Sequence, residues 1–324
     1  MKDLSKDSVR RLTVGDAGAG QRVDNFLLRH LKGVPKSHVY RILRRGEVRL
    51  NSGRVKPDAK LAAGDVLRIP PLRIATPDTE QPRPAQGSRL SRLRILYEDD
   101  SLLAVDKPAG LAVHGGSGVS LGLIEQLRAS RPESFLELVH RLDRETSGIL
   151  LVAKQRTALI RLHAALREGG VDKRYIVLVR GRWRDETRRV DLPLHKFLTG
   201  EGERRVRVER EAGKAATTVF RRQRVWHGEP ALSLLEAQLR TGRTHQIRVH
   251  LTHLGFPLAG DDKYGDFDWN RRLAKRGLKR MFLHAWRLAL PHPVEARQLA
   301  LESPLPRELS AFLAQLEDAE RRDG

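Results

Sequence analysis

Cysteine is absent from the 324-residue chain. Without thiols the protein has no disulfides, zinc fingers, iron–sulfur clusters or thiolate nucleophiles. Long apolar runs are missing too, since no segment approaches the about 18 consecutive apolar residues that a membrane-spanning helix requires. The first residues, MKDLSKDSVRRLTV, lack the apolar region of a secretory signal. We therefore expect a cytoplasmic protein that does not associate with membranes.

The motifs of common cofactors are also missing. Neither the G-x-G-x-x-G of dinucleotide sites nor the GK[ST] that ends a phosphate-binding loop occurs in the chain. Ser147 is not set in the G-x-S-x-G elbow of hydrolases. We expect a reaction that uses no cofactor.

Acidic residues are outnumbered by basic ones. The chain has 61 Lys and Arg against 40 Asp and Glu, a formal net charge of +21. Such a charge favours a polyanionic partner, and phosphate contacts supply most of the non-specific affinity for nucleic acid. An anionic membrane surface is the competing partner, but no long basic helix with aromatic anchors supports it. Nucleic acid is therefore the expected partner.

Residues 20–72 have the pattern of a small α/β module. Apolar residues recur at helical spacing over residues 21–33 and again over residues 35–46, and short apolar runs predict strands at residues 48–50 and 66–69. Four basic residues lie largely off the apolar stripe of the second helix: Lys36, Arg41, Arg44 and Arg45. A solvated helix face explains this pattern, and so does a surface that contacts phosphates.

Residues 73–92 are rich in proline and polar residues, which is typical of an extended linker. Beyond residue 92, strands and helices alternate, and we expect one large domain over residues 93–316. Residues 1–19 are expected to form an N-terminal arm and residues 317–324 a frayed tail. Within the large domain the apolar runs predict strands at residues 149–152, 174–179, 217–220 and 232–239, and helices at residues 119–129 and 157–167.

The most specific segment is HRLDRETSG, residues 140–148. Asp143 lies between Arg141 and Arg144, and a buried strand is predicted directly after the segment. A carboxylate held among cations stays ionised at neutral pH and presents a nucleophile. A surface turn held by salt bridges is the simpler interpretation of R-x-D-R taken alone.

Two further segments carry residues suited to a site. Tyr175 follows Lys173 and Arg174 at the start of a predicted strand, where an ordinary half-buried aromatic is also common. In TGRTHQIRVH, residues 241–250, a strand turns into a helix. Arg248 lies off the apolar stripe of that helix and can project toward a site.

Together the three segments resemble the RluA-type pseudouridine synthases. The resemblance implies an α+β fold, with a mixed, mostly antiparallel sheet in the catalytic domain. It implies isomerisation of specific uridines to pseudouridine in 23S ribosomal RNA of the large subunit, with base flipping and no cofactor. It assigns the nucleophile to Asp143 and the arginine paired with it to Arg248. Tyr175 would stack on the uracil, and Arg141 would fill the space that the flipped nucleotide leaves.

The N-terminal module resembles the S4 RNA-binding domain, through its order of helix, basic helix, GEVRLN turn and AGDVLRIPP. This resemblance implies that Lys36, Arg41, Arg44 and Arg45 contact RNA phosphates. In the catalytic domain, Arg243 and His245 are further candidates for RNA contacts. We expect a monomer that binds ribosomal RNA.

Other interpretations apply to single motifs. His245, His250 and His253 suggest a metal site, but the spacing of H-E-x-x-H is missing. The acidic residues between 261 and 268 resemble a two-metal nuclease site, although a polar turn explains them better. No metal is expected. The remaining alternatives are a related synthase with another RNA target and a non-catalytic RNA-binding protein on the same scaffold.

Overall fold

The structure, a computed structural model, describes residues 9–31, 34, 36–72, 93–115, 121–200 and 203–323. The chain divides into two compact units, Met1–Gln86 and Gly87–Gly324. The linker expected at residues 73–92 lies outside the described residues, as do residues 1–8 of the expected arm.

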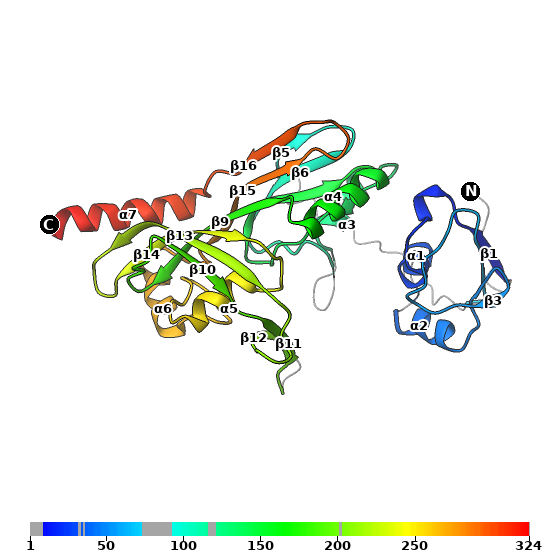
Figure 1. The fold of residues 1–324 in the computed structure, drawn as a ribbon, viewed down its shortest axis with the longest axis horizontal. Coiled ribbons are helices and arrows are strands. Elements are labelled where there is room, and N and C mark those ends of the chain that lie inside the picture. Colours follow the sequence, from blue (N-terminus) through cyan, green and yellow to red (C-terminus); the bar gives the residue numbers. More distant parts are fainter. Residues whose placement is uncertain are drawn as a thin grey trace. The chain divides into compact units, whose positions relative to one another are not determined.

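The N-terminal unit combines two α-helices with a four-stranded antiparallel sheet of order β1-β4-β2-β3 (Figure 1). Its described elements are β1 Arg10–Thr13, the 3-10 helix η1 Asp16–Gly18, α1 Val23–His30, α2 Lys36–Arg44, β2 Arg49–Leu50, β3 Gly53–Arg54 and β4 Val66–Ile69. Phe26 and Leu27 of α1 pack with Val39 and Ile42 of α2 in one core, as their helical spacing predicts.

The expected N-terminal arm differs from the structure. Strand β1 pairs with β4 along its whole length, from Arg10 opposite Ile69 to Thr13 opposite Val66. The pairing satisfies an edge of β4 that would otherwise expose its N–H and C=O groups. Residues 10–13 therefore belong to the sheet.

The C-terminal unit is built on a mixed sheet of ten strands among the described residues. Eight strands follow the order β10-β13-β14-β9-β15-β8-β6-β5, with β16 added at β15 and β7 at β8. The bounds are β5 Arg94–Glu98, β6 Leu102–Lys107, β7 Glu137–Leu138, β8 Ser147–Ala153, β9 Asp172–Arg180, β10 Thr187–Asp191, β13 Thr217–Trp226, β14 Leu232–Leu239, β15 Leu283–Pro291 and β16 Gln298–Glu302. Only β8 and β15 pair in parallel, which confirms the predicted α+β fold with a mostly antiparallel sheet.

Helices cover both faces of this sheet. They are α3 Leu123–Ser130, α4 Arg156–Glu168, α5 Gln246–His253, α6 Phe267–Lys275 and α7 Arg307–Asp323. Because side chains alternate along a strand, Val177 and Val179 of β9 join a core with α3 and α5, whereas Ile176 and Leu178 pack with α6 and α7. Tyr175 has the parity of Val177, so it faces the side of α5.

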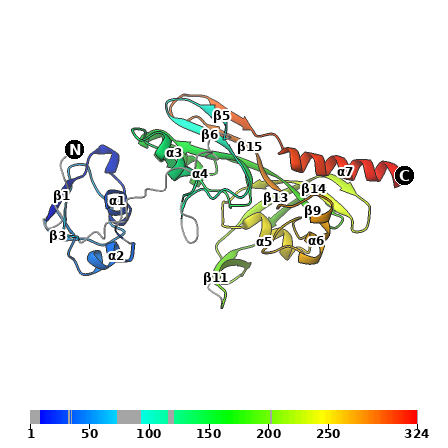
Figure 2. The ribbon, with the colours of Figure 1, turned by 180° about the vertical axis from the view of Figure 1, so that it is seen from behind.

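A separate hairpin of β11 Leu194–Leu198 and β12 Arg204–Val208 projects from the body of the unit (Figure 2). Its base is apolar, since Leu194 and Val206 pack with Val249 of α5. The hairpin is thereby attached to the helix that carries Arg248.

Two predicted helix boundaries were wrong. The helix expected at residues 119–129 begins at Leu123. The Glu125 carboxylate accepts a hydrogen bond from the N–H of Gly122 (2.9 Å) and caps the N-terminus of the helix there. Residues 119–120 lie outside the described residues. At the other end of the chain, α7 continues through the expected tail to Asp323. Its buried Leu316 and the ion pairs from Arg224 to two glutamates of α7 stabilise these last turns.

Candidate active site

The loop of residues 140–146 joins β7 to β8 and is closed by a required glycine. Gly148 has φ +110°, and a Cβ atom there would lie 2.2 Å from the carbonyl oxygen of Ala285. Only glycine allows this conformation and this approach of the two backbones. It lets β8 lie in parallel beside β15, directly after the loop that carries Asp143.

A buried lysine anchors the same loop through hydrogen bonds. The ammonium of Lys107, at the end of β6, donates to the carbonyl oxygens of Pro108 (2.9 Å), Leu111 (2.9 Å) and Arg144 (3.0 Å). Burial lowers the pKa of Lys107 to about 7. Its three bonds satisfy the buried ammonium itself, and they fix the loop to the sheet.

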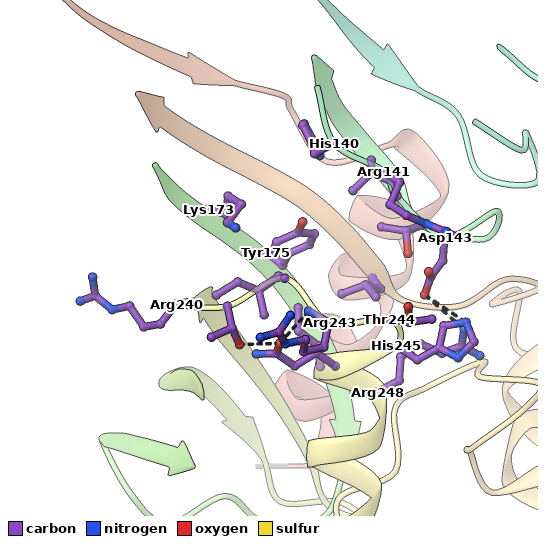
Figure 3. A pocket seen from close by; sticks show the side chains of 18 of the residues that line it. His140, Arg141, Asp143, Lys173, Tyr175, Arg240, Arg243, Thr244, His245 and Arg248 are labelled. Carbon is purple, nitrogen blue, oxygen red and sulfur yellow. Dashed lines mark hydrogen bonds and ion pairs between the residues drawn. The ribbon is translucent and has the colours of Figure 1, made fainter. Parts of the chain in front are cut away.

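The structure brings six of the predicted site residues together around one cavity of about 500 Å³ (Figure 3). They are Arg141, Asp143, Tyr175, Arg243, His245 and Arg248. The loop 140–146, strand β9 and the start of α5 each supply part of the lining. Among the described residues that line the cavity, Asp143 is the only carboxylate.

The other predicted contacts belong to the N-terminal unit. Arg41, Arg44 and Arg45 are exposed at α2 and the turn that follows it. The side chain of Lys36 lies outside what the structure describes.

Arg248 lies near three carboxylates, and the nearest is not Asp143. The exposed carboxylate of Asp262 lies 3.6 Å from its Nη2. Nε and Nη2 of Arg248 donate to Asp261 at 2.7 and 2.6 Å, whereas its Nη1 lies 3.4 Å from Oδ2 of Asp143. Burial alone would lower the pKa of Arg248, but its bonds to Asp261 raise it above its ordinary value. The guanidinium is therefore a permanent charge that Asp261 holds. Figure 3 shows it beside Asp143.

His245 also lies near Oδ2 of Asp143. Its Nε2 lies 3.8 Å from Oδ2 of Asp143, which is too long for a hydrogen bond. Its Nδ1 lies 2.8 Å from the hydroxyl of Tyr264. Burial lowers the pKa of His245, although the charge of Asp143 opposes this shift, so the imidazole is neutral at neutral pH.

Tyr175 forms the aromatic wall of the cavity. It is buried, and burial together with the nearby charge of Asp143 raises its pKa well above the ordinary value. The phenol is therefore neutral and offers a ring face rather than a base. Lys173, two residues earlier on the same face of β9, lines the cavity beside it (Figure 3).

The remaining cations of the cavity lack acidic partners. Among the described residues, no ion pair is formed by Arg141, Arg167, Lys173, Arg240 or Arg243, all of which line the cavity. Their charges are concentrated around a single carboxylate that already has Arg248 beside it. The cavity is thus suited to an anionic ligand.

The acidic cluster near residue 261 is divided among different partners. Asp261 binds Arg248, Asp266 caps α6 by accepting from the N–H of Trp269, and Asp268 pairs with Arg271. Among the described residues, no group of three or more potential ligands is arranged to hold a metal ion. Within the same residues, no helix combines the length and apolar character that crossing a membrane requires.

Comparisons with known proteins decide the family. The model of the RNA pseudouridylate synthase family matches residues 101–253, and the S4 domain model matches residues 21–67. The ribosomal large subunit pseudouridine synthase C of Haemophilus ducreyi is 50% identical over 312 residues, covering 95% of this chain and 96% of the relative. The chain belongs to the pseudouridine synthase family.

Further relatives agree with this membership, and the predicted RluA-type resemblance is confirmed. The ribosomal large subunit pseudouridine synthase C of Escherichia coli K12 is 50% identical over 317 residues, covering 96% of this synthase and 98% of the relative. Within the family, the strings GVPKSHVYRILRRGEVR and LAVHGGSGVS predict similarity to the large subunit synthases C. The two relatives confirm this prediction.

A solved structure supports the fold of the synthase. The human RNA pseudouridylate synthase domain containing 1 has a TM-score of 0.55 and 29% identity, covering 71% of this chain and 94% of that one.

Three residues that position the site were missed in the sequence. Asp261 and Tyr264 lie in GDDKYGD, whose acidic residues resemble a two-metal nuclease site but are better explained by a polar turn, and Lys107 lies in DKPAG, to which the sequence assigns no role. One signal was available for Asp261: a buried arginine on an adjacent helix needs a carboxylate, and Asp143 alone leaves most of its N–H groups unpaired.

Proposed function

We propose that this synthase converts specific uridines of large subunit ribosomal RNA to pseudouridine, with Asp143 as the nucleophile. The observation that carries the proposal is the cavity in which Asp143, the only carboxylate among its described lining residues, faces the ring of Tyr175 and the guanidinium of Arg248. Support for the RNA target comes from the relatives that are named large subunit synthases.

The reaction is an isomerisation within one nucleotide. The bond between N1 of uracil and C1′ of the ribose breaks, the base turns, and C5 bonds to C1′. N1 gains a proton and C5 loses one, so the step balances without a co-reactant. Asp143 would assist the cleavage at the ribose, and the guanidinium of Arg248 would lie beside its carboxylate.

Access to the base requires that the uridine leaves the RNA stack. Tyr175 offers a buried, neutral ring on which the extruded uracil can stack. Arg141 is exposed two residues before Asp143, where it can enter the space that the nucleotide leaves. Stacking and gap filling together offset the cost of flipping, which is a few kcal/mol.

The charged groups outside the chemistry would hold the RNA backbone. Arg243 and the other unpaired cations at the cavity are suited to phosphates near the flipped nucleotide. In the N-terminal unit, Lys36, Arg41, Arg44 and Arg45 would contact RNA at a second place. Work on ribosomal RNA would place the enzyme in the cytoplasm, and we propose that it acts as a monomer without a cofactor.

The test is Asp143→Asn. The variant should lose pseudouridine formation by at least roughly 10⁴-fold, because it removes the nucleophile. RNA binding should persist, since an amide of the same size replaces the carboxylate. Mapping pseudouridines in ribosomal RNA from cells with the wild-type enzyme, with the variant and with neither identifies the targets. Normal modification by the variant would refute the role of Asp143.

A further inference from the structure

The turn Asp261–Tyr264 contacts both groups that face Asp143. Asp261 is fully buried and accepts from Nε and Nη2 of Arg248 at 2.7 and 2.6 Å. The same carboxylate accepts from the backbone N–H groups of Lys263 (2.9 Å) and Tyr264 (3.0 Å), which fixes the turn itself. Two of the three guanidinium nitrogens are thereby occupied, and Nη1 is left to face Asp143.

The hydroxyl of Tyr264 defines the state of His245. It accepts a hydrogen bond from the backbone N–H of Val206, in β12, at 2.9 Å. Its own proton is then free for Nδ1 of His245, 2.8 Å away. A neutral imidazole that accepts at Nδ1 carries its proton on Nε2. The Nε2–H group of His245 therefore faces Asp143.

The backbone of His245 is held in an unusual conformation. The residue precedes α5 with φ 54° and ψ 21°, in the left-handed region that is costly for a residue with a side chain. Its ring also meets the ring of Tyr264 edge to face, with the centroids 5.5 Å apart. Strain of this kind persists only where surrounding contacts impose it.

We propose that the turn Asp261–Tyr264 is the positioning element of the active site, in which Asp261 aims Arg248 and Tyr264 aims His245 at Asp143. His245 then presents a neutral Nε2–H toward the reacting carboxylate, 3.8 Å away, rather than serving as an RNA contact. The proposal rests on the role of Asp143 given above. Asp261 and Tyr264 are positioning residues, since neither lines the cavity.

Burial favours the neutral ring of His245, while the charges around it oppose one another: Asp143 and Asp261 raise its pKa, and Arg248 and Lys263 lower it. The loop 140–146 contributes Asp143, α5 contributes Arg248, and the turn contributes Asp261, Lys263 and the Tyr264 hydroxyl. The two cations and burial disfavour protonation, and a hydroxyl that donates to Nδ1 stabilises only the neutral form. A protonated His245 would instead neutralise the carboxylate that has to react.

The discriminating variant is Tyr264→Phe, which removes one hydroxyl and keeps the ring beneath the Arg248 guanidinium. The variant loses the hydrogen bonds to His245 and from Val206. Loss of the bond to His245 predicts a kcat lower by roughly 3- to 10-fold, with KM for RNA nearly unchanged. Without the donated hydrogen bond the pKa of His245 rises, so the acid limb of the kcat profile should move to higher pH. Adding His245→Gln, whose amide donates but does not titrate, should abolish this shift.

The chain offers a matched control in Tyr97→Phe. The Tyr97 hydroxyl also makes two hydrogen bonds, to Asp99 (2.6 Å) and from Arg297 (2.7 Å), and an arginine lies over its ring, but it does not line the cavity. This variant should keep the wild-type kcat and pH profile. Equal kcat and pH profiles for the two variants would overturn the proposal, and so would a Tyr264→Phe effect confined to KM.

A direct measurement on the wild-type enzyme does not depend on the folding of Tyr264→Phe. ¹⁵N NMR of labelled histidine reports the tautomer, and His245→Gln identifies the signal. The Nε2–H tautomer is expected at neutral pH, and the Nδ1–H tautomer would overturn the proposal. If Asp143→Asn is inactive while these tests fail, only the positioning role is wrong. If Asp143→Asn is active, the proposed function itself fails.

Discussion

Asp143 and Asp261 bind the same arginine in opposite ways. Asp261 is fully buried and bidentate, with both contacts at or below 2.7 Å, whereas the side chain of Asp143 is 19% exposed and 3.4 Å from Arg248. Besides its two bonds from Arg248, the Asp261 carboxylate accepts hydrogen bonds from two backbone N–H groups. Asp143 keeps its carboxylate largely uncommitted at the wall of a cavity.

The difference separates a structural carboxylate from a reactive one. A buried ion pair with several hydrogen bonds is rigid, and it makes a poor nucleophile because its charge is already satisfied. A partly exposed carboxylate with only long contacts keeps its access to substrate. One arginine links the two, so the geometry of the reactive site depends on the structural pair.

The largest effect on stability is expected from Asp261→Asn. The change leaves Arg248 as a buried charge without its main partner, so the free energy of unfolding should fall by about 3–5 kcal/mol. Urea denaturation measures it. Asp143→Asn, with its long contact, should change the same quantity by less than about 1 kcal/mol.

The neighbour Asp262 provides the control for this pair. It is 66% exposed, and its carboxylate lies 3.6 Å from Nη2 of the same arginine. Asp262→Asn should leave both stability and activity near the wild-type values. A loss of stability equal to that of Asp261→Asn would show that burial does not distinguish the two carboxylates.

Arg248→Lys tests whether one cation has to serve both carboxylates. A lysine is a point charge without the planar fork, so it cannot hold Asp261 in a bidentate contact and face Asp143 as well. Activity should fall by roughly 10²-fold, the effect of losing one preorganised donor. Single-turnover kinetics measure this loss, with Arg287→Lys, at an exposed position of β15, as the control. Activity close to wild type would show that charge alone suffices.

The N-terminal unit should contribute affinity without chemistry. Replacing Arg44 and Arg45 together by alanine should reduce the salt slope of RNA binding by up to about 1.4, the value for two phosphate contacts on single-stranded RNA. Filter binding across salt concentrations measures the slope, and kcat at saturating RNA should not change. An unchanged slope would argue that α2 faces away from RNA.

The smallest effect is expected at Lys173, the cation beside Tyr175. Burial lowers its pKa, so between that lowered value and about 10.4 the unfolded chain binds more protons than the folded one. Wild-type stability should therefore rise with pH across this window, and Lys173→Gln should lack this contribution. The same variant should reduce the salt slope of RNA binding by about 0.7. Parallel pH profiles for the two proteins would refute the shift.

Local patterns predicted the elements and the reactive residues. Apolar periodicity located α1, α2, α4, β9 and β14, because burial of one face repeats with the period of the element. The segment HRLDRETSG and its two companions predicted Asp143, Tyr175 and Arg248, which the structure brings to one cavity. Their catalytic roles are predictions that the variants above test.

What the sequence by itself determined is this set of elements, the family and six of the residues that line the cavity. Only the tertiary structure decided that Asp261 binds two of the three guanidinium nitrogens of Arg248 and that the hydroxyl of Tyr264 is hydrogen-bonded to His245. Polar side chains in an irregular turn follow no period, so their partners depend on how the turn folds back against α5. The same holds for Lys107, whose three carbonyl partners come from two loops that meet only in the folded chain.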